Sequence, residues 1–263
     1  MRAVGYVDGM NFYEASKDKQ WYPAGWCNWR ETVATYCPGA DVSVCYFTTL
    51  YTGKDQTRVR RQKLHLRAME EVARAEIIYG SCRERPIKCP ECKSILKCRC
   101  GCERRFAEKM TDVNIAVRLL EDAIDGMFNR AYVVTSDVDL APAVYAALRR
   151  APNSQIFILL PPDTVMVEEF AALGRQYPGR SKAEYLDLNK MRRFPDDLPK
   201  RWNLPFPKHW RQDAGRRPSR PEQEITKVPH AKRTASWADE STGYGTKDVA
   251  RDLLKTPVSH KRS

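Results

Sequence analysis

The sequence predicts an α/β fold with a mainly parallel sheet between two layers of helices. Short, continuously apolar segments recur along the chain, which is typical of strands buried on both faces. Segments with a helical spacing of apolar residues separate them, and this alternation indicates parallel strands joined by helices. The chain has 263 residues, 42% of them hydrophobic, which is enough for one substantial core and additional segments.

The predicted strands are short apolar runs bounded by polar residues, glycine or proline. In chain order they are Ala3–Val7, Val42–Thr48, Ala75–Tyr79, Ala131–Thr135, Ile156–Leu160 and Glu184–Leu188. The clearest helical pattern begins near Thr111 and has one apolar stripe, of the kind that faces a core, made of Val113, Ala116, Val117, Leu120 and Ile124. Further helices are predicted at Asp55–Arg74, Asp139–Arg149 and Val165–Arg175.

Two regions interrupt this alternation. Residues 81–106 are rich in cysteine and form a predicted insert within a domain of residues 1–190. Residues 191–263 are rich in Pro, Arg, Lys, Ser and Thr without periodicity, which predicts a mostly disordered basic tail. Within this tail, the segment Trp202–Trp210 is a candidate for packing back on the domain.

The formal net charge of +12 favours a polyanionic partner, with nucleic acid as the first candidate. Residues 191–263 hold 17 Lys and Arg against 9 Asp and Glu, so a basic tail that contacts RNA or a protein partner explains part of the excess. No apolar stretch approaches the ~20 residues that span a membrane. Asp8 and Asn11 interrupt the apolar segment that a secretion signal would need, so we expect a cytoplasmic protein with no membrane partner.

Carboxylates follow two predicted strands and begin one predicted helix. Asp8 ends the first strand, Asp137 and Asp139 follow the fourth, and Asp112 lies in the first turn after Thr111, the expected N-cap. The carboxyl ends of parallel strands meet at one edge, where ligands bind. Clustered carboxylates repel one another unless a cation joins them, and Mg²⁺ or Mn²⁺ prefers such oxygen ligands.

Each carboxylate also has a structural interpretation. Asp112 can complement the helix dipole, Asp137 or Asp139 can cap the following helix, and Asp8 can anchor the turn at Gly9. The neighbouring Asn11 offers a neutral amide for a phosphate oxygen or a metal-bound water. A divalent cation at such a site can bridge a scissile phosphate and lower the pKa of a bound water, which is the chemistry of phosphodiester hydrolysis.

Three segments, VDGMNFY, EKMTDVNIAVRLLEDA and VVTSDVDLAPAV, resemble in order the signature segments of the NYN family of PIN-like nucleases. The resemblance covers about residues 1–188. It implies a Rossmann-like, three-layer α/β/α sandwich and metal-dependent endonucleolytic cleavage, usually of RNA. It also implies a catalytic set of five residues, Asp8, Asn11, Asp112, Asp137 and Asp139, with Ser136 beside them as a substrate-binding residue. Asp8, Asp112 and Asp137 of this set would be ligands of Mg²⁺ or Mn²⁺.

Two other functions remain open from the sequence. A catalytically inactive RNA-binding adaptor would use the same fold with its cysteine-rich insert and tail. A phosphatase of another Rossmann-like class is less well supported, because its nucleophilic aspartate normally lies in a DxD pattern and the second residue after Asp8 is Met10.

Six of the nine cysteines lie within CRERPIKCPECKSILKCRCGC, between Cys82 and Cys102. The CPEC segment gives Cys89 and Cys92 the spacing of a tetrahedral zinc site. Two further ligands come from Cys98, Cys100 and Cys102, and the sequence leaves the choice open, with Cys82 as a substitute. We expect one structural Zn²⁺, against the alternatives of an iron–sulfur cluster, a redox pair or disulfides. Three other cysteines are expected to be small buried residues: Cys27, Cys37 and Cys45.

Basic and aromatic residues supply candidate RNA contacts. Arg58 and Arg61 belong to a predicted helix that also carries Arg60, Lys63, Arg67 and Arg74, and Lys109 follows the insert. These side chains can bind phosphates or form a solvated helix face. Several aromatic residues lie at the end of the VDGMNFY segment or soon after it: Tyr13, Trp21, Tyr22 and Trp26. They can stack on unpaired bases, or they can pack within a surface loop.

Overall fold

The computed structural model describes residues 1–16, 24–51, 53, 55–86 and 104–207. The chain divides into two compact units, residues 1–218 and 219–263, and the second contains no described residue. The predictions for the tail beyond residue 207 therefore lie outside the described residues. None of the helices in the described ranges combines the length and the apolar character that crossing a bilayer requires.

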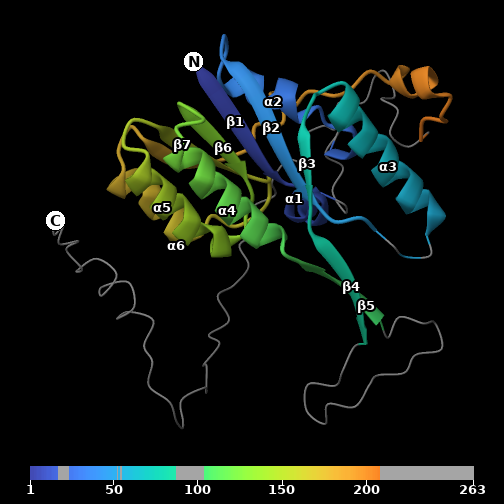
Figure 1. Ribbon diagram of the computed structural model, residues 1–263, viewed down its shortest axis with the longest axis horizontal. Coiled ribbons are helices and arrows are strands. Elements are labelled where there is room, and N and C mark those ends of the chain that lie inside the picture. The colour runs from blue at the N-terminus through green and yellow to red at the C-terminus, as the bar shows by residue number, and fades with distance from the viewer. Residues whose placement is uncertain (17–23, 52, 54, 87–103, 208–263) are drawn as a thin grey trace, which may run out of the picture. The chain divides into compact units, whose positions relative to one another are not determined.

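A six-stranded parallel sheet forms the centre of the first unit (Figure 1). Its spatial order is β3-β2-β1-β6-β7-β8, which reverses direction between β1 and β6. In open parallel sheets, this reversal point is where ligands bind at the carboxyl ends of the strands. The strands are β1 (Arg2–Asp8), β2 (Asp41–Thr48), β3 (Glu76–Tyr79), β6 (Arg130–Val134), β7 (Gln155–Leu160) and β8 (Ser181–Tyr185).

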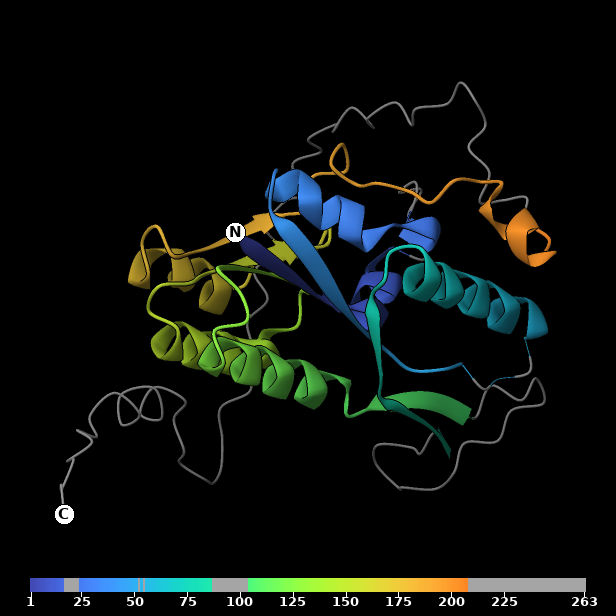
Figure 2. The same ribbon diagram turned by 45° about the horizontal axis from the view of Figure 1, so that its top comes forward.

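Helices cover both faces of the sheet, as Figure 2 shows. One core forms under α1 (Gly9–Ser16), α2 (Trp29–Tyr36) and α3 (Gln56–Glu71). The other forms under α4 (Thr111–Ile124), α5 (Ala141–Arg150) and α6 (Glu168–Gln176). Alternate residues of β1 enter the two cores, because successive side chains of a strand point to opposite faces. The predicted α/β fold with a parallel sheet between helices is confirmed.

A two-stranded antiparallel hairpin of β4 (Ser81–Pro86) and β5 (Arg104–Lys109) forms the stem of the predicted insert. It leaves β3 at Gly80 and returns directly to α4. A Cβ on Gly80 would lie 2.7 Å from the Lys109 carbonyl oxygen and even closer to the Thr111 hydroxyl, so only glycine allows this close approach. Residues 87–103, which include the five cysteines from which the four zinc ligands are predicted, lie outside the described residues.

The packed part of the chain continues beyond residue 190, where the sequence placed the start of the tail. Met191, Phe194 and Leu198 are buried in the core under α2 and α3, and the last begins a 3-10 helix, Leu198–Trp202. The Trp202 indole donates a hydrogen bond to Glu71 at 2.6 Å. The expected boundary is therefore too early, because Pro- and Arg-rich composition hides a few well-spaced apolar residues. Packing of the segment from Trp202 is confirmed as far as it is described.

Strand β8 and helix α2 illustrate how single elements differ from the sequence prediction. Strand β8 begins three residues earlier than predicted, because an edge strand has one free side and accepts the polar residues Ser181, Lys182 and Glu184. Helix α2 was not predicted. It begins after Asn28, whose side chain accepts a hydrogen bond from the Glu31 N–H at 3.2 Å and so caps the helix.

Helix α4 turns a different face to the sheet than predicted. Val113, Val117 and Ile124 from the predicted stripe are 63%, 48% and 60% exposed. The buried face instead contains the apolar residues Ile115, Leu119 and Ala123 together with two polar residues, Thr111 and Asp122. Both polar side chains are hydrogen-bonded, and this allows them to face inward. The predicted stripe is wrong because polar residues interrupt the true core face.

Substitutions on the two faces of α4 are expected to differ strongly in their effect on stability. Leu119→Ala removes a buried side chain and should lower the free energy of unfolding by about 2–5 kcal/mol. Val117→Ala removes a half-exposed side chain and should change it by less than about 0.5 kcal/mol. Urea unfolding of the two variants gives both values, and equal losses would contradict the observed orientation of α4.

Candidate active site

Asp8 is buried at the carboxyl end of β1 and is 3% exposed. Parallel pairing places Val7 beside Val134 of β6, so Thr135 lies next to Asp8 at the point where the strand order reverses. The Thr135 hydroxyl donates to Asp8 Oδ2 at 3.2 Å, and the Asn11 N–H donates to Oδ1 at 3.0 Å. Both carboxylate oxygens are therefore fixed in position at the edge of the sheet.

Burial, together with neighbouring carboxylates, disfavours the charged form of Asp8. Burial raises the pKa of Asp8 to about 7, and the Glu108 and Asp112 carboxylates act in the same direction against the Asn11 hydrogen bond. The pKa of Asp112 is also raised, by partial loss of solvent and then by the carboxylates of Asp137 and Asp139. These side chains come from β1, β5, α4 and the loop after β6, and each interacts electrostatically with at least one other of the group. We call this group the carboxylate rim: Asp8, Glu108, Asp112, Asp137 and Asp139.

Asn11 joins the first helix to the loop after β6. Its side-chain oxygen accepts hydrogen bonds from the Ser136 N–H at 2.9 Å and from the Ser136 hydroxyl at 3.0 Å. Asn11, predicted to hold a phosphate oxygen or a metal-bound water, therefore binds Ser136 and connects the chain after β1 to the chain after β6. These hydrogen bonds give Asn11 and Ser136 a positioning role beside the carboxylate rim.

Asp137 and Asp139 begin a short 3-10 helix, Val138–Leu140, that leads into α5. Asp137 Oδ1 accepts the Asp139 N–H at 3.0 Å, and the Asp137 N–H donates to the Thr135 hydroxyl at 3.0 Å. The capping interpretation is therefore correct for Asp137. The same contacts hold the Asp137 carboxylate close enough to Asp112 to raise the pKa of Asp112. Asp137 therefore both caps the 3-10 helix and belongs to the carboxylate rim.

The start of α4 differs from the prediction of Thr111 as N-cap. Met110 occupies that position with a left-handed φ of 79°, and it makes no side-chain capping bond. The Thr111 hydroxyl instead donates a short hydrogen bond to Glu108. Burial raises the pKa of Glu108, and Asp112 and Glu14 reinforce the shift. Sequence reasoning missed Glu108, although its place three residues before Thr111 in EKMTD marks it as a second carboxylate at the helix start.

The rim has the donor chemistry of a site for a hard cation, since all its ligand atoms are carboxylate oxygens. Among the described residues, no group of three or more His, Cys, Asp or Glu side chains is placed so that it could hold a metal ion. Burial raises the pKa of Asp8 and Asp112, and repulsion from neighbouring carboxylates adds to the rise. A divalent cation would relieve this repulsion. The donor atoms of the rim are of the type that Mg²⁺ and Mn²⁺ prefer, and Asp8, Asp112 and Asp137 remain the predicted ligands.

The predicted substrate contacts fall into different environments. Arg58 and Arg61 are half-buried on α3, and the Arg58 guanidinium lies over the rings of Tyr13 and Tyr51. Lys109 is exposed and lies close enough to Asp112 to act against the rise of its pKa. Three further basic residues of the predicted set are exposed: Arg60, Lys63 and Arg74.

Two predicted contacts serve packing instead. Trp26 is 1% exposed and packs against Phe194 and Phe206, so its proposed stacking on bases is wrong. Arg67 pairs with Glu71 at 2.7 Å and lies 4.8 Å from the Trp202 ring centre. Trp21 and Tyr22 lie outside the described residues.

The cysteines divide into buried residues, a half-buried thiol and predicted zinc ligands. Cys27, Cys37 and Cys45 are buried, as predicted. Cys82 of β4 is a half-buried free thiol. The zinc ligands remain a prediction, because they lie outside the described residues: Cys89, Cys92, Cys98, Cys100 and Cys102.

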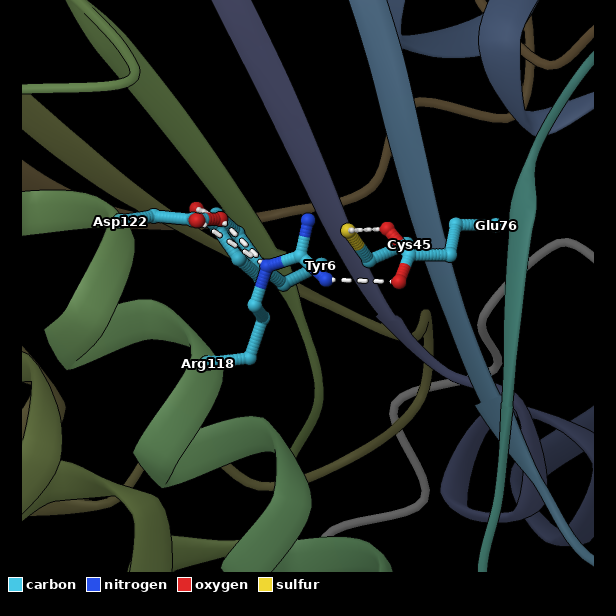
Figure 3. A network of polar contacts seen from close by, with 5 residues as sticks. All are labelled: Tyr6, Cys45, Glu76, Arg118 and Asp122. Carbon is cyan, nitrogen blue, oxygen red and sulfur yellow. Dashed lines mark hydrogen bonds and ion pairs between the residues drawn. The ribbon is translucent and has the colours of Figure 1, made fainter. Parts of the chain in front are cut away.

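A polar network fixes α4, which carries Asp112, to the sheet (Figure 3). The buried Tyr6 hydroxyl of β1 donates to Asp122 at 2.6 Å. Arg118 donates from Nε to both Asp122 oxygens at 3.0 Å and from a terminal nitrogen to Glu76 of β3 at 2.8 Å. The network therefore connects β1, α4 and β3. The sequence pattern did not reveal it.

Comparisons with known proteins give only partial similarities. No protein-family model matches the sequence. Over 79 residues, or 30% of this chain, the sequence is 34% identical to 6-hydroxy-3-succinoylpyridine 3-monooxygenase HspA of Pseudomonas putida, and the match spans 23% of that protein's length. A crystal structure of a Vibrio parahaemolyticus protein of unknown function, VPA0982, aligns with 73% of this chain and 96% of its own, at 16% identity and a TM-score of 0.46. These similarities are too short or too weak to show a family or an activity.

Proposed function

We propose that the protein is a metal-dependent endoribonuclease that hydrolyses phosphodiester bonds of single-stranded RNA. The observation that supports this function best is the carboxylate rim at the reversal point of the sheet, where Asp8 has a pKa of about 7 because of burial and its carboxylate neighbours. Such a site attracts a hard dication, and a dication beside a phosphodiester is a common arrangement for its hydrolysis. The resemblance of three sequence segments to NYN-family nucleases supports the same proposal.

The residues of the chain have distinct parts in this function. Asp8, Asp112 and Asp137 hold Mg²⁺ or Mn²⁺, which supplies charge neutralisation at the phosphate and an acidified water. Thr135 orients Asp8 and the Asp137 backbone through two hydrogen bonds. Arg58, Arg61 and Lys109 bind phosphates of the substrate. Asn11 and Ser136 keep the ends of β1 and β6 at a fixed spacing through their hydrogen bonds.

The test is incubation of the full-length protein with a mixed single-stranded RNA pool. Cleavage is expected with added Mg²⁺ or Mn²⁺, and its loss without either ion should be reversed when the ion is returned. Asp137→Asn should remove cleavage, because the rim loses one anionic ligand. Asp125→Asn, at an exposed carboxylate that ends α4, is the control and should cleave normally.

The inactive RNA-binding adaptor is the alternative function. It predicts RNA binding that is unchanged in Asp137→Asn and no cleavage with any divalent ion. Faster turnover of small phosphomonoesters than of RNA would favour the phosphatase instead. Either result would contradict the proposed nuclease.

We also propose a structural Zn²⁺ in the insert, held by Cys89, Cys92 and two of the three cysteines at 98, 100 and 102. Elemental analysis of protein purified without added metal is expected to give about one zinc per chain, since a closed four-thiolate site binds one ion. Double substitution of Cys89 and Cys92 by serine should remove it. Iron with visible absorbance, or a metal content unchanged in this variant, would contradict the zinc site.

A further inference from the structure

A cavity of about 370 Å³ adjoins the carboxylate rim. Its wall includes Glu108 of β5 and the first residues of α1, Gly9 and Met10, which directly follow Asp8. The volume lies at the lower end of the range for small-molecule sites, about 300–1,000 Å³, and suits a ligand of nucleotide size.

Aromatic side chains from three parts of the chain line this cavity. Phe12 and Tyr46 are buried, while Tyr13 and Tyr51 are partly exposed. Gly9 makes the wall possible, because a Cβ at this position would lie 2.5 Å from Tyr46 Cζ. Aromatic faces bind unpaired bases by stacking, with little dependence on base identity.

Two arginines place positive charge in the same wall. The Arg58 guanidinium lies 5.0 Å from the ring centre of Tyr13 and 4.3 Å from that of Tyr51, and Arg61 lines the cavity one helical turn further along α3. Contact with two rings restricts Arg58, so it loses less freedom when it pairs with a phosphate. The wall therefore combines surfaces for a base and for a phosphate.

The cavity wall is organised without a ligand. Gln62 donates to the Thr49 carbonyl oxygen at 2.7 Å and accepts the Tyr51 N–H at 2.8 Å, which fixes the loop that carries Tyr51. The His65 Nε2–H donates to the Cys27 carbonyl oxygen at 3.1 Å, and burial lowers the pKa of His65 to about 4. His65 is therefore neutral at pH 7.

We propose that this cavity is a nucleotide subsite, in which one unpaired base contacts the tyrosines and its phosphate contacts Arg58 and Arg61. The choice of ligand rests on the proposed nuclease function, because the next phosphate of a bound strand would lie toward the rim. Paired and stacked bases of a duplex cannot enter. A free mononucleotide and a nucleotide within single-stranded RNA share the required chemistry.

Protection of Cys82 from alkylation tests occupancy of the cavity directly. Cys82 is part of the cavity wall, and the tryptic peptide Ala75–Arg83 contains no other cysteine. Full-length protein is treated with N-ethylmaleimide at pH 8 without added Mg²⁺ or Mn²⁺, and the peptide is followed by mass spectrometry. At a ligand concentration about ten times its Kd, labelling of Cys82 is expected to slow about tenfold. Labelling of buried Cys45 reports unfolding.

Ligands and variants distinguish the outcomes. Adenosine and uridine monophosphates test the free nucleotide, and a short single-stranded RNA tests the strand; protection by either supports the subsite and identifies its source. Arg58→Ala should weaken protection and RNA binding about tenfold, since it removes a stacked phosphate contact. Arg60→Ala, which removes an exposed charge from the same helix, should have less than about a threefold effect.

Three results would overturn the subsite: no protection by any nucleotide or RNA, equal protection by duplex or abasic RNA, or equal losses in Arg58→Ala and Arg60→Ala. RNA cleavage is measured separately with Mn²⁺. Cleavage with any of these three results would leave the nuclease function intact and remove the subsite. Protection without cleavage under any metal would retain the subsite and contradict the nuclease.

Discussion

Asp8→Asn is expected to stabilise the folded protein above pH 7 and to abolish RNA cleavage. Burial and neighbouring carboxylates raise the pKa of Asp8 to about 7 from its ordinary value near 4. Between these two values the folded protein retains a proton that the unfolded chain has lost, so the free energy of unfolding falls as the pH rises through this window. Above pH 7 the folded state carries the full cost of a buried charge.

An asparagine at position 8 carries no charge and removes this cost. The gain in the free energy of unfolding should therefore be near zero below pH 4, grow between pH 4 and 7, and reach on the order of 2–4 kcal/mol at pH 8. Urea unfolding at pH 4, 6 and 8 measures the difference between the variant and the unsubstituted protein. Asp125→Asn is the matched control, since it makes the same substitution at an exposed side chain that ends α4.

A divalent cation should also reduce the cost that the charge of Asp8 imposes on the folded protein. Added Mg²⁺ or Mn²⁺ at pH 8 is expected to stabilise the unsubstituted protein, because a ligand that binds only the folded state raises its stability by mass action. The effect should be much smaller in Asp8→Asn. A variant that is less stable than the unsubstituted protein at pH 8, or one that gains as much from the ion, would contradict the proposed role of Asp8.

Strand ends were the most predictable part of the candidate site. Asp8 and Asp137 follow short apolar runs, and the parallel order of the sheet brings such positions to one edge whatever their distance in sequence. Glu108 could not be placed this way, because it enters the rim from a hairpin whose strands carry no apolar pattern. Its role depends on the turn at Gly80 and on the hydrogen bond from Thr111.

Helix orientation was less predictable than helix position. The bounds of α4 agree with its periodicity, but the exposed residues Val113 and Val117 form a stripe as regular as the buried one. Periodicity reports that apolar residues share a face, and it does not report which face meets the sheet. Buried Asp122 decides the orientation here through its contacts with Tyr6 and Arg118. These contacts are hard to predict from the sequence, because Tyr6 is distant along the chain and Arg118 is one of several charged residues of the helix.

Asp122→Ala is expected to be among the most destabilising single substitutions in the described part of the chain. It leaves the Tyr6 hydroxyl buried without its acceptor and removes the two-oxygen contact of Arg118. Loss of such a buried partner should lower the free energy of unfolding by about 2–4 kcal/mol. Glu76→Ala removes a half-exposed partner of the same arginine and should cost less than about 1 kcal/mol.

A double-mutant cycle separates this network from simple loss of packing. Tyr6→Phe alone should cost about 1 kcal/mol, because the ring remains and only the hydroxyl is lost. Combined with Asp122→Ala it should cost less than the sum, since neither partner is then left unsatisfied. Urea unfolding at pH 7 gives all four corners of the cycle. Additive costs, or an Asp122→Ala effect no larger than that of Glu76→Ala, would mean that apolar packing alone orients α4 and its Asp112.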